Sequence, residues 1–151
     1  MALSTGDTIL KWAGWVTLEA SGASVSAGAI SAAATTECTS TNHEDAPLLT
    51  FGIEAAYGAN TPTEGKTVDL YAKINTITGV ASEDGNVPTT AHLSTYLGSA
   101  MLKASAGTQY LSIGPVSLPG KEFNLYVVNG DDTDAMTWQL YMNPTSFAAK
   151  A

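Results

Sequence analysis

Nucleophilic catalysis needs a nucleophile, a base and a group that orients the base, and this chain offers few candidates for the base. The sequence has two histidines, His43 and His92, and His43 stands in a polar run with Glu44 and Asp45. No Gly-x-Ser-x-Gly motif, which would place a nucleophilic serine on a tight turn, occurs in the chain. We therefore predict that both histidines are loop or strand-surface residues, and that the protein is not an enzyme.

Carboxylates gather in three short runs, at residues 44–45, 83–84 and 131–134. Glycoside hydrolysis uses two carboxylates that face each other from separate elements, whereas sequence neighbours in a turn mainly solubilise the chain. The run at 129–134, Asn-Gly-Asp-Asp-Thr-Asp, leaves Ca²⁺ binding open, although Asx-rich turns also form for backbone reasons and the EF-hand spacing is missing. Without a glycine-rich phosphate loop, we expect no cofactor and, that alternative aside, no metal site.

Cys38 is the only cysteine, so no intrachain disulfide and no Cys-x-x-Cys motif can form. No basic residue stands beside it in the sequence to lower its pKa, which predicts a buried or inert thiol. The first residues lack a basic region followed by an apolar run, and no stretch reaches about 18 apolar residues. We expect neither a secretory signal nor a membrane span, and assembly in a reducing cytosol.

The charge balance argues against nucleic acid and against anionic membranes as partners. The chain contains no arginine, its six lysines are scattered, and its formal net charge is -8 with a pI near 4.4. Such a chain is repelled by phosphate backbones and by anionic lipid headgroups. Charged residues are only 13% of the chain, and Ser and Thr supply the remaining polarity, which disfavours a helical bundle with a charged wet face.

Alternation of apolar and polar residues with a period of two is the dominant pattern, and it predicts half-buried antiparallel strands. The clearest strands are expected at residues 10–18, 67–75, 122–127 and 137–142, and weaker ones at 24–36, 48–57, 92–103 and 109–113. Turn residues separate them at 58–62, 83–86, 118–120 and 129–134. About eight strands without amphipathic helices between them predict an all-β, single-domain antiparallel β-sandwich, jelly-roll-like, over residues 1–151.

Two regions fit this pattern less well. Residues 20–41 are almost entirely Ala, Ser, Gly and Thr, so within residues 1–41 we expect an edge segment or an N-terminal arm that orders against a neighbour. Leu93, Leu97 and Met101 recur every four residues, which leaves a short helix over 93–106 as an alternative to a strand.

Four aromatic side chains fall on strand faces opposite the predicted core: Trp15, Tyr71, Tyr126 and Tyr141. Outward aromatic residues on a β-sandwich often form a contact surface for protein or sugar, so we predict that these four lie at an interface. The alternative is that a second element of the same chain covers them. Alternation around Val16 further predicts that Trp12 is a core residue and that Trp15 is an interface residue.

The string of strands and turns resembles a group of small virion structural proteins of tailed bacteriophages. The resemblance rests on the segments Gly-Lys-Thr-Val-Asp-Leu-Tyr-Ala (65–72), Tyr-Leu-Gly-Ser (96–99), Leu-Pro-Gly-Lys-Glu-Phe-Asn-Leu-Tyr-Val-Val-Asn (118–129) and Trp-Gln-Leu-Tyr-Met (138–142). These segments span the C-terminal half to two-thirds of the chain, and none is a catalytic signature.

The resemblance implies a jelly-roll decoration (cement) protein on the capsid exterior, made in the host cytoplasm. Its implied partners are the major capsid protein and further copies of itself, as a homotrimer, with residues 1–41 making inter-subunit or capsid contacts. A tail, collar or fibre-base component would have a similar sequence. A carbohydrate-binding or host-adsorption module belongs to a different class, and would place aromatic and Asx residues together at one loop end. A hydrolase is the third alternative.

Overall fold

Eight strands and one short helix make up the part of the chain that the computed structural model describes, residues 8–75 and 95–149. In chain order they are β1 (Thr8–Trp12), β2 (Val16–Val25), α1 (Ser40–His43), β3 (Leu48–Ala56), β4 (Thr67–Ile74), β5 (Thr95–Met101), β6 (Thr108–Ser117), β7 (Phe123–Asn129) and β8 (Met136–Ala149). The all-β class and the number of strands agree with the alternation in the sequence.

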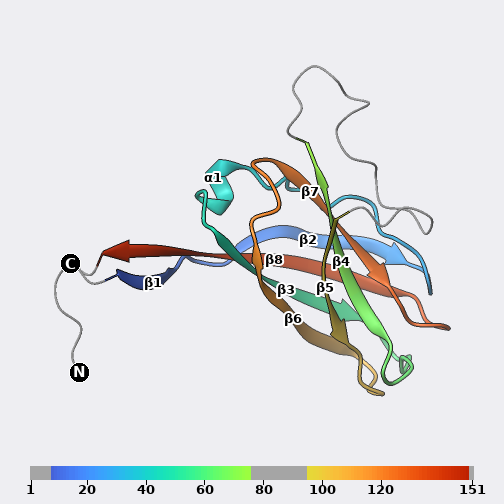
Figure 1. Ribbon diagram of the computed structural model, residues 1–151. Coiled ribbons are helices and arrows are strands. Elements are labelled where there is room, and N and C mark those ends of the chain that lie inside the picture. Colours follow the sequence, from blue (N-terminus) through green and yellow to red (C-terminus); the bar gives the residue numbers. More distant parts are fainter. Residues whose placement is uncertain (1–7, 76–94, 150–151) are drawn as a thin grey trace, which may run out of the picture.

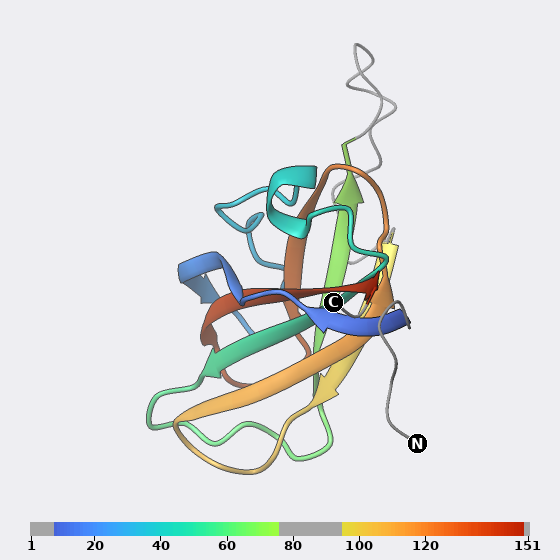
Figure 2. The ribbon, with the colours of Figure 1, turned by 90° about the vertical axis from the view of Figure 1, so that its left-hand side faces the viewer.

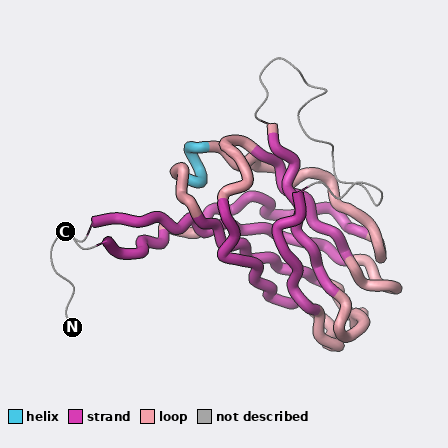
Figure 3. Tube along the Cα trace, in the orientation of Figure 1, coloured by secondary structure: helices cyan, strands magenta, loops and turns pink. Residues whose placement is uncertain are grey.

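The strands form two antiparallel sheets that face each other (Figures 1 and 3). Sheet A has the order β1-β8-β3-β6, and β2 pairs with β8 as well. β1 pairs with the last residues of β8, and β2 pairs with its first half. β1 and β2 therefore lie one after the other along β8. Sheet B has the order β5-β4-β7.

The connection after β2 supplies a fourth, irregular member of sheet B. Isolated bridges join Ile30 to Val128 and Cys38 to Phe123, so residues 30–38 run along the open side of β7. With that segment included, the strand order in one layer is β1/β2-β8-β3-β6. The order in the other layer is segment 30–38, then β7, β4 and β5. The chain therefore crosses between the sheets as in a jelly roll. The predicted β-sandwich is confirmed.

The core lies between the two sheets and is filled by alternate residues of their central strands. The members with the least exposure include Leu49, Phe51, Ile53, Val68, Leu70, Phe123, Leu125, Val127, Leu140 and Met142. Those outside β3 are inward positions that the period of two predicts for residues 67–75, 122–127 and 137–142. The face of sheet A that points away from sheet B is called the outer face below.

The end of β8 leaves the sandwich. This strand is 14 residues long, and β3 pairs with it only as far as Thr145. Beyond that point, among the described strands, β8 pairs with β1 alone, and the two strands project from the body as a two-stranded ribbon (Figure 1). In Figure 2 the side that carries this ribbon faces the viewer. We call this ribbon, residues 8–12 and 145–149, the arm.

Three expectations need correction or qualification. Residues 10–18 are not one strand, because the chain is irregular at 13–15 between β1 and β2. Alternation is therefore not continuous from Val16 to Trp12, and the prediction that Trp12 is a core residue is wrong: it lies on the arm and is 65% exposed. Residues 24–36 form no regular strand after Val25.

The strand, not the helix, is correct in the region of residues 93–106, where β5 spans Thr95–Met101. The expected turn at 83–86 and His92 lie outside the described residues.

Candidate functional site

The structure separates the four aromatic residues predicted at an interface into two pairs. Trp15 is 58% exposed and lies near the partly exposed Tyr141 on the outer face of sheet A. Tyr71 and Tyr126 are register partners in sheet B, and both are buried within the chain. The ring of Tyr71 packs against that of Tyr96, with 5.4 Å between centroids. That Trp15 and Tyr141 meet a partner stays a prediction, and Tyr71 and Tyr126 present little surface to one.

A shallow hollow of about 430 Å³ on the outer face brings Trp15 and Tyr141 together with Tyr110. Gly52 of β3 forms its floor, because it stands opposite Tyr141 of β8 and carries no side chain. The nearest indole carbon of Trp15 lies 3.4 Å from where a Cβ at residue 52 would stand, so the ring lies close over the backbone. We call this surface the outer hollow: Trp15, Gly52, Glu54, Tyr110, Leu111 and Tyr141.

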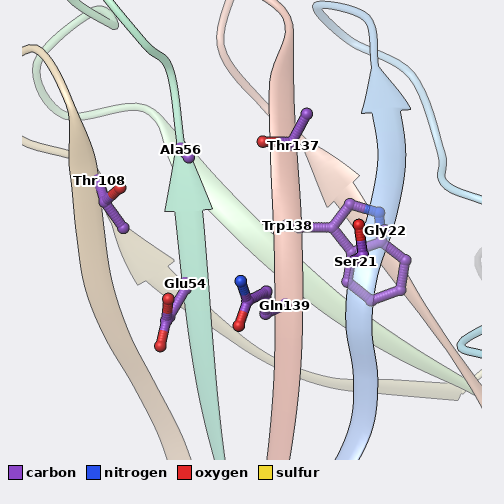
Figure 4. A pocket seen from close by; sticks show the side chains of 8 residues that line it. All are labelled: Ser21, Gly22, Glu54, Ala56, Thr108, Thr137, Trp138 and Gln139. Carbon is purple, nitrogen blue, oxygen red and sulfur yellow. The ribbon is translucent and has the colours of Figure 1, made fainter.

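Polar groups continue from the outer hollow into a second depression of about 190 Å³ (Figure 4). Glu54 and Gln139 are register partners on β3 and β8, and their side chains lie side by side in the figure. Hydroxyl groups of Ser21, Thr108 and Thr137 line the same depression. At its other side Trp138 lies against Gly22, where an added Cβ would stand 2.4 Å from the indole nitrogen.

The hydroxyl of Tyr141 is the polar group at the junction of the two depressions. It donates a hydrogen bond to Oε1 of Gln139 at 2.5 Å. Partial burial, followed by the nearby carboxylate of Glu54, raises the pKa of Tyr141 above its ordinary value, so the hydroxyl stays protonated as a donor. Glu54 is the one carboxylate among the described residues that line either depression, so no carboxylate pair for glycoside hydrolysis forms there.

The arm carries the other exposed apolar surface of sheet A. Leu10 stands directly opposite Phe147 in the register, and Trp12 stands opposite Thr145, so Leu10, Trp12 and Phe147 share one face of the ribbon. Their exposed fractions are 47%, 65% and 60%. We call these three side chains the arm cluster. Among the described residues, the outer edges of the arm pair with no other strand beyond Thr145, where β3 pairs with β8 for the last time. Open edges of this kind favour pairing with another chain.

Sequence reasoning missed the arm cluster and Tyr110. Phe147 has the same parity as Tyr141 on β8, so extending the alternation past residue 142 would have placed both on one face. Tyr110 lies between Gln109 and Leu111 in a predicted strand, and is 77% exposed. No local pattern in the sequence indicates that β8 continues beyond the end of its neighbour β3.

The Asx-rich turn at 129–134 is organised by Asp131 through hydrogen bonds. Its carboxylate accepts from the backbone N–H of Thr63 at 2.6 Å, of Asp134 at 2.7 Å and of Thr133 at 3.2 Å. Burial of Asp131 opposes ionisation, but these donors outweigh it and lower the pKa of the carboxyl group to about 2. Among the described residues, no group of three or more His, Cys, Asp or Glu side chains is placed to hold a metal ion.

His43 is not at the surface, which corrects the prediction for this residue. It ends α1, has no exposed area, and stacks on Phe123 with 6.0 Å between ring centroids. Its Nδ1 accepts from the N–H of Asp45, which leaves Nε2 to donate to the carbonyl of Lys121 at 2.8 Å. The two ring nitrogens therefore join the chain after α1 to the segment just before β7. His92 lies outside the described residues.

Cys38 is buried, as predicted. It has no exposed area, and burial, followed by the charge of Glu37, raises the pKa of its thiol to about 12. A thiol held in this way is protonated at neutral pH and is a poor nucleophile.

No protein-family model matches this chain, and a search of curated protein sequences finds no match either. In the part of the chain that the structure describes, no helix has the length and apolar character needed to cross a membrane.

Proposed function

We propose that the protein is a structural component of a tailed-bacteriophage virion, a decoration protein that binds the outside of the capsid and stabilises it against packaged DNA. The observation that carries the proposal is the arm, a projecting two-stranded ribbon with three large apolar side chains in solvent. An isolated ribbon of two strands is marginally stable in water, so this element is built to lie against something else. Adhesion between molecules is the function that such a part serves.

The rest of the surface supports the same role. The outer hollow adds further exposed aromatic area on sheet A, and exposed apolar patches of this kind mark interaction sites. Many copies bound to one shell would add their contacts, so weak individual contacts suffice to stabilise the particle. The net charge of -8 keeps finished particles apart in solution. On this proposal the chain is made in the host cytoplasm, and its partners are the major capsid protein and copies of itself.

A carbohydrate- or host-binding module is the second candidate, and one observation favours it. The exposed ring of Trp15 lies beside the polar groups of Tyr141 and Glu54, a combination that suits stacking and hydrogen bonding to a sugar. The Asx-rich turn at 129–134 is not part of this surface, however, so it does not join the exposed aromatic residues of the outer hollow. The arm also has no role in this alternative.

Binding of the wild-type protein to mature capsids that lack it tests the proposal. A decoration protein binds such capsids saturably and raises their melting temperature, and antibody label on purified particles spreads over the head in electron micrographs. Label confined to the tail or neck would contradict capsid decoration and favour a tail, collar or fibre-base component. Binding to cells or to a glycan array, with capsid stability unchanged, would replace the proposal by the adsorption module.

A further inference from the structure

The arm cluster and the outer hollow lie on the same side of sheet A. Alternate residues of one strand share a face, so Tyr141 in the hollow and Phe147 on the arm point to the same side of β8. The register then places Leu10 and Trp12 on that side as well. The outer face thus carries a group of protruding apolar side chains and, further along β8, a concave surface lined by aromatic rings.

These two surfaces cannot meet within one molecule. Tyr141 and Phe147 are six residues apart on one extended strand, which separates them by about 20 Å. By alternation along the strand both lie on the same side of β8, and β8 is continuous between them. The arm cluster therefore needs a receiving surface on another molecule, and the hollow needs an occupant from another molecule.

We infer that the arm cluster of one copy of this chain seats in the outer hollow of another copy. The inference rests on the proposed function and deepens it, since it names a partner of the arm and the surface that receives it. Each copy has one arm and one hollow, so the contact repeats until the assembly closes, with two copies exchanging arms or with a ring of three.

Charge does not oppose this pairing. Lys11 is the only charged residue of the arm, whereas the chain as a whole carries a net charge of -8. The hollow itself contains Glu54 and no cation among its described lining residues. Lys11 alternates with Leu10 and Trp12 and therefore stands on the other face of the ribbon, so the arm cluster brings no charge of its own to Glu54.

The exposed apolar area of the two surfaces is also of the order that a stable interface needs. At roughly 200 Å² for an aromatic side chain, Trp12 and Phe147 of the arm offer on the order of 250 Å², and Trp15 and Tyr110 of the hollow offer about as much. In a pair that exchanges arms, each copy therefore contributes on the order of 500 Å² to the shared interface. A stable interface buries about 800 Å² on each partner. Leu10, Leu111 and the open edge of β1 supply part of the remainder, and a closed assembly uses both surfaces of every copy.

Light scattering coupled to size-exclusion chromatography tests the inference without capsids. We expect the wild-type protein to elute at two or three times its subunit mass of 15.5 kDa. The variant L10S/F147S should fall to the subunit mass, and Tyr110→Ser, on the hollow side, should weaken assembly at least tenfold. The matched control is Y96S/M101S, which removes an exposed aromatic and an exposed aliphatic side chain from β5 and should keep the wild-type mass.

Cross-linking gives a second readout that does not depend on how well L10S/F147S folds. Chains with Leu10→Cys, mixed with chains with Tyr110→Cys, should form a disulfide-linked dimer on oxidation, because the native Cys38 is buried and stays out of the reaction. Chains with Leu10→Cys and chains with Met101→Cys should not. A monomeric wild-type protein at all concentrations, unchanged assembly of L10S/F147S, or equal cross-linking in both mixtures would overturn the inference.

Failure of the inference differs from failure of the proposed function. A wild-type protein that stays monomeric but saturates capsids and raises their melting temperature refutes arm exchange and keeps decoration. An oligomer that forms the Leu10–Tyr110 cross-link and does not bind capsids keeps arm exchange and refutes decoration.

Discussion

Single side chains fasten the end of the sandwich that lies away from the arm. Tyr57 donates a hydrogen bond to Oδ1 of Asn129 at 2.9 Å, and the amide of Asn129 donates to the carbonyls of Val25 and Asp134. Asp131, next to this group, holds the N–H of Thr63 at 2.6 Å. The β7–β8 turn is thus joined to the end of β2, to the end of β3 and to the loop before β4. An Asx-rich sequence that could suggest a cation site serves here as a hydrogen-bonded corner.

Asp131→Asn should lower the free energy of unfolding by about 2–3 kcal/mol at pH 7, because hydrogen bonds to a buried charged acceptor are lost. The folded pKa of about 2 lies below the ordinary value of 3.8, so the carboxylate stabilises the fold above pH 4 and loses this effect as the pH falls toward 2. Urea denaturation of wild type and variant at several pH values measures both effects.

The control is Asp132→Asn, which removes an exposed partner of Lys66 and should change stability by less than about 1 kcal/mol. A gap between wild type and Asp131→Asn that stays the same from pH 7 down to pH 2 would contradict the assignment of this stability to the ionised carboxylate.

Among the elements, β1 of the arm differs from the other strands in having no buried side chain. β3 lies between two neighbours, β6 and β8, and its inward side chains are fully buried. Among the described strands, β1 pairs with β8 alone, and none of its five residues is buried. Local stability in proteins follows such differences in burial and in hydrogen bonding.

Hydrogen exchange should therefore separate the two strands. In dilute, dissociated protein we expect amides of residues 8–12 to exchange at least about 1000-fold faster than those of residues 49–55. Assembly should slow exchange in the arm and leave β3 nearly unchanged. Equal protection of β1 and β3 in the monomer would show that the arm is stable without a partner.

At this scale the sequence predicts the regular strands well and the irregular ones poorly. Residues 67–75 and 122–127 alternate because each strand has one face on the core, and the structure places them in β4 and β7. Residues 26–39 follow β7 through isolated bridges and single hydrogen bonds, which leave no periodic pattern to detect. The arm is invisible for a related reason, since Trp12 and Phe147 are apolar residues without a core to face.

The same limit applies to the candidate site. Alternation correctly directs Tyr141 away from the core, because it reports which face of a strand a residue occupies. Trp15 is exposed as expected, but it lies in the irregular stretch before β2, where alternation does not apply. Alternation also does not report whether a face is covered, and in sheet B Tyr71 and Tyr126 are buried although they stand outside the core cluster. Covering depends on contacts between segments far apart in the sequence, which one sequence alone does not contain.

For the whole molecule, the three tryptophans report separately on core, arm and outer face. Trp138 is 3% exposed in the core, whereas Trp12 and Trp15 are 65% and 58% exposed. We expect acrylamide to quench Trp12 and Trp15 in the dissociated subunit and to spare Trp138. Assembly should protect the first two indoles, because both belong to surfaces that the inferred contact covers.

Single Trp→Phe variants assign the fluorescence emission to individual tryptophans. Trp138→Phe is the control, and it should remove only the fluorescence that acrylamide does not quench. A Trp15 that is as protected in the monomer as Trp138 would exclude it from an interface. Accessible Trp12 and Trp15 in intact particles would show that neither surface is used there.

The continuity of β8 also has a mechanical consequence. Because one strand runs from the arm into the centre of sheet A, a pull on the arm is carried along the axis of β8 into the sandwich. The hydrogen bonds that join β8 to β3 over residues 137–145 lie across that direction, so they bear the force together in shear instead of opening one at a time. An arm tied to a separate edge hairpin would peel away under the same load. This one transmits tension to the central strands of sheet A, which suits the proposed role of stabilising a capsid against packaged DNA.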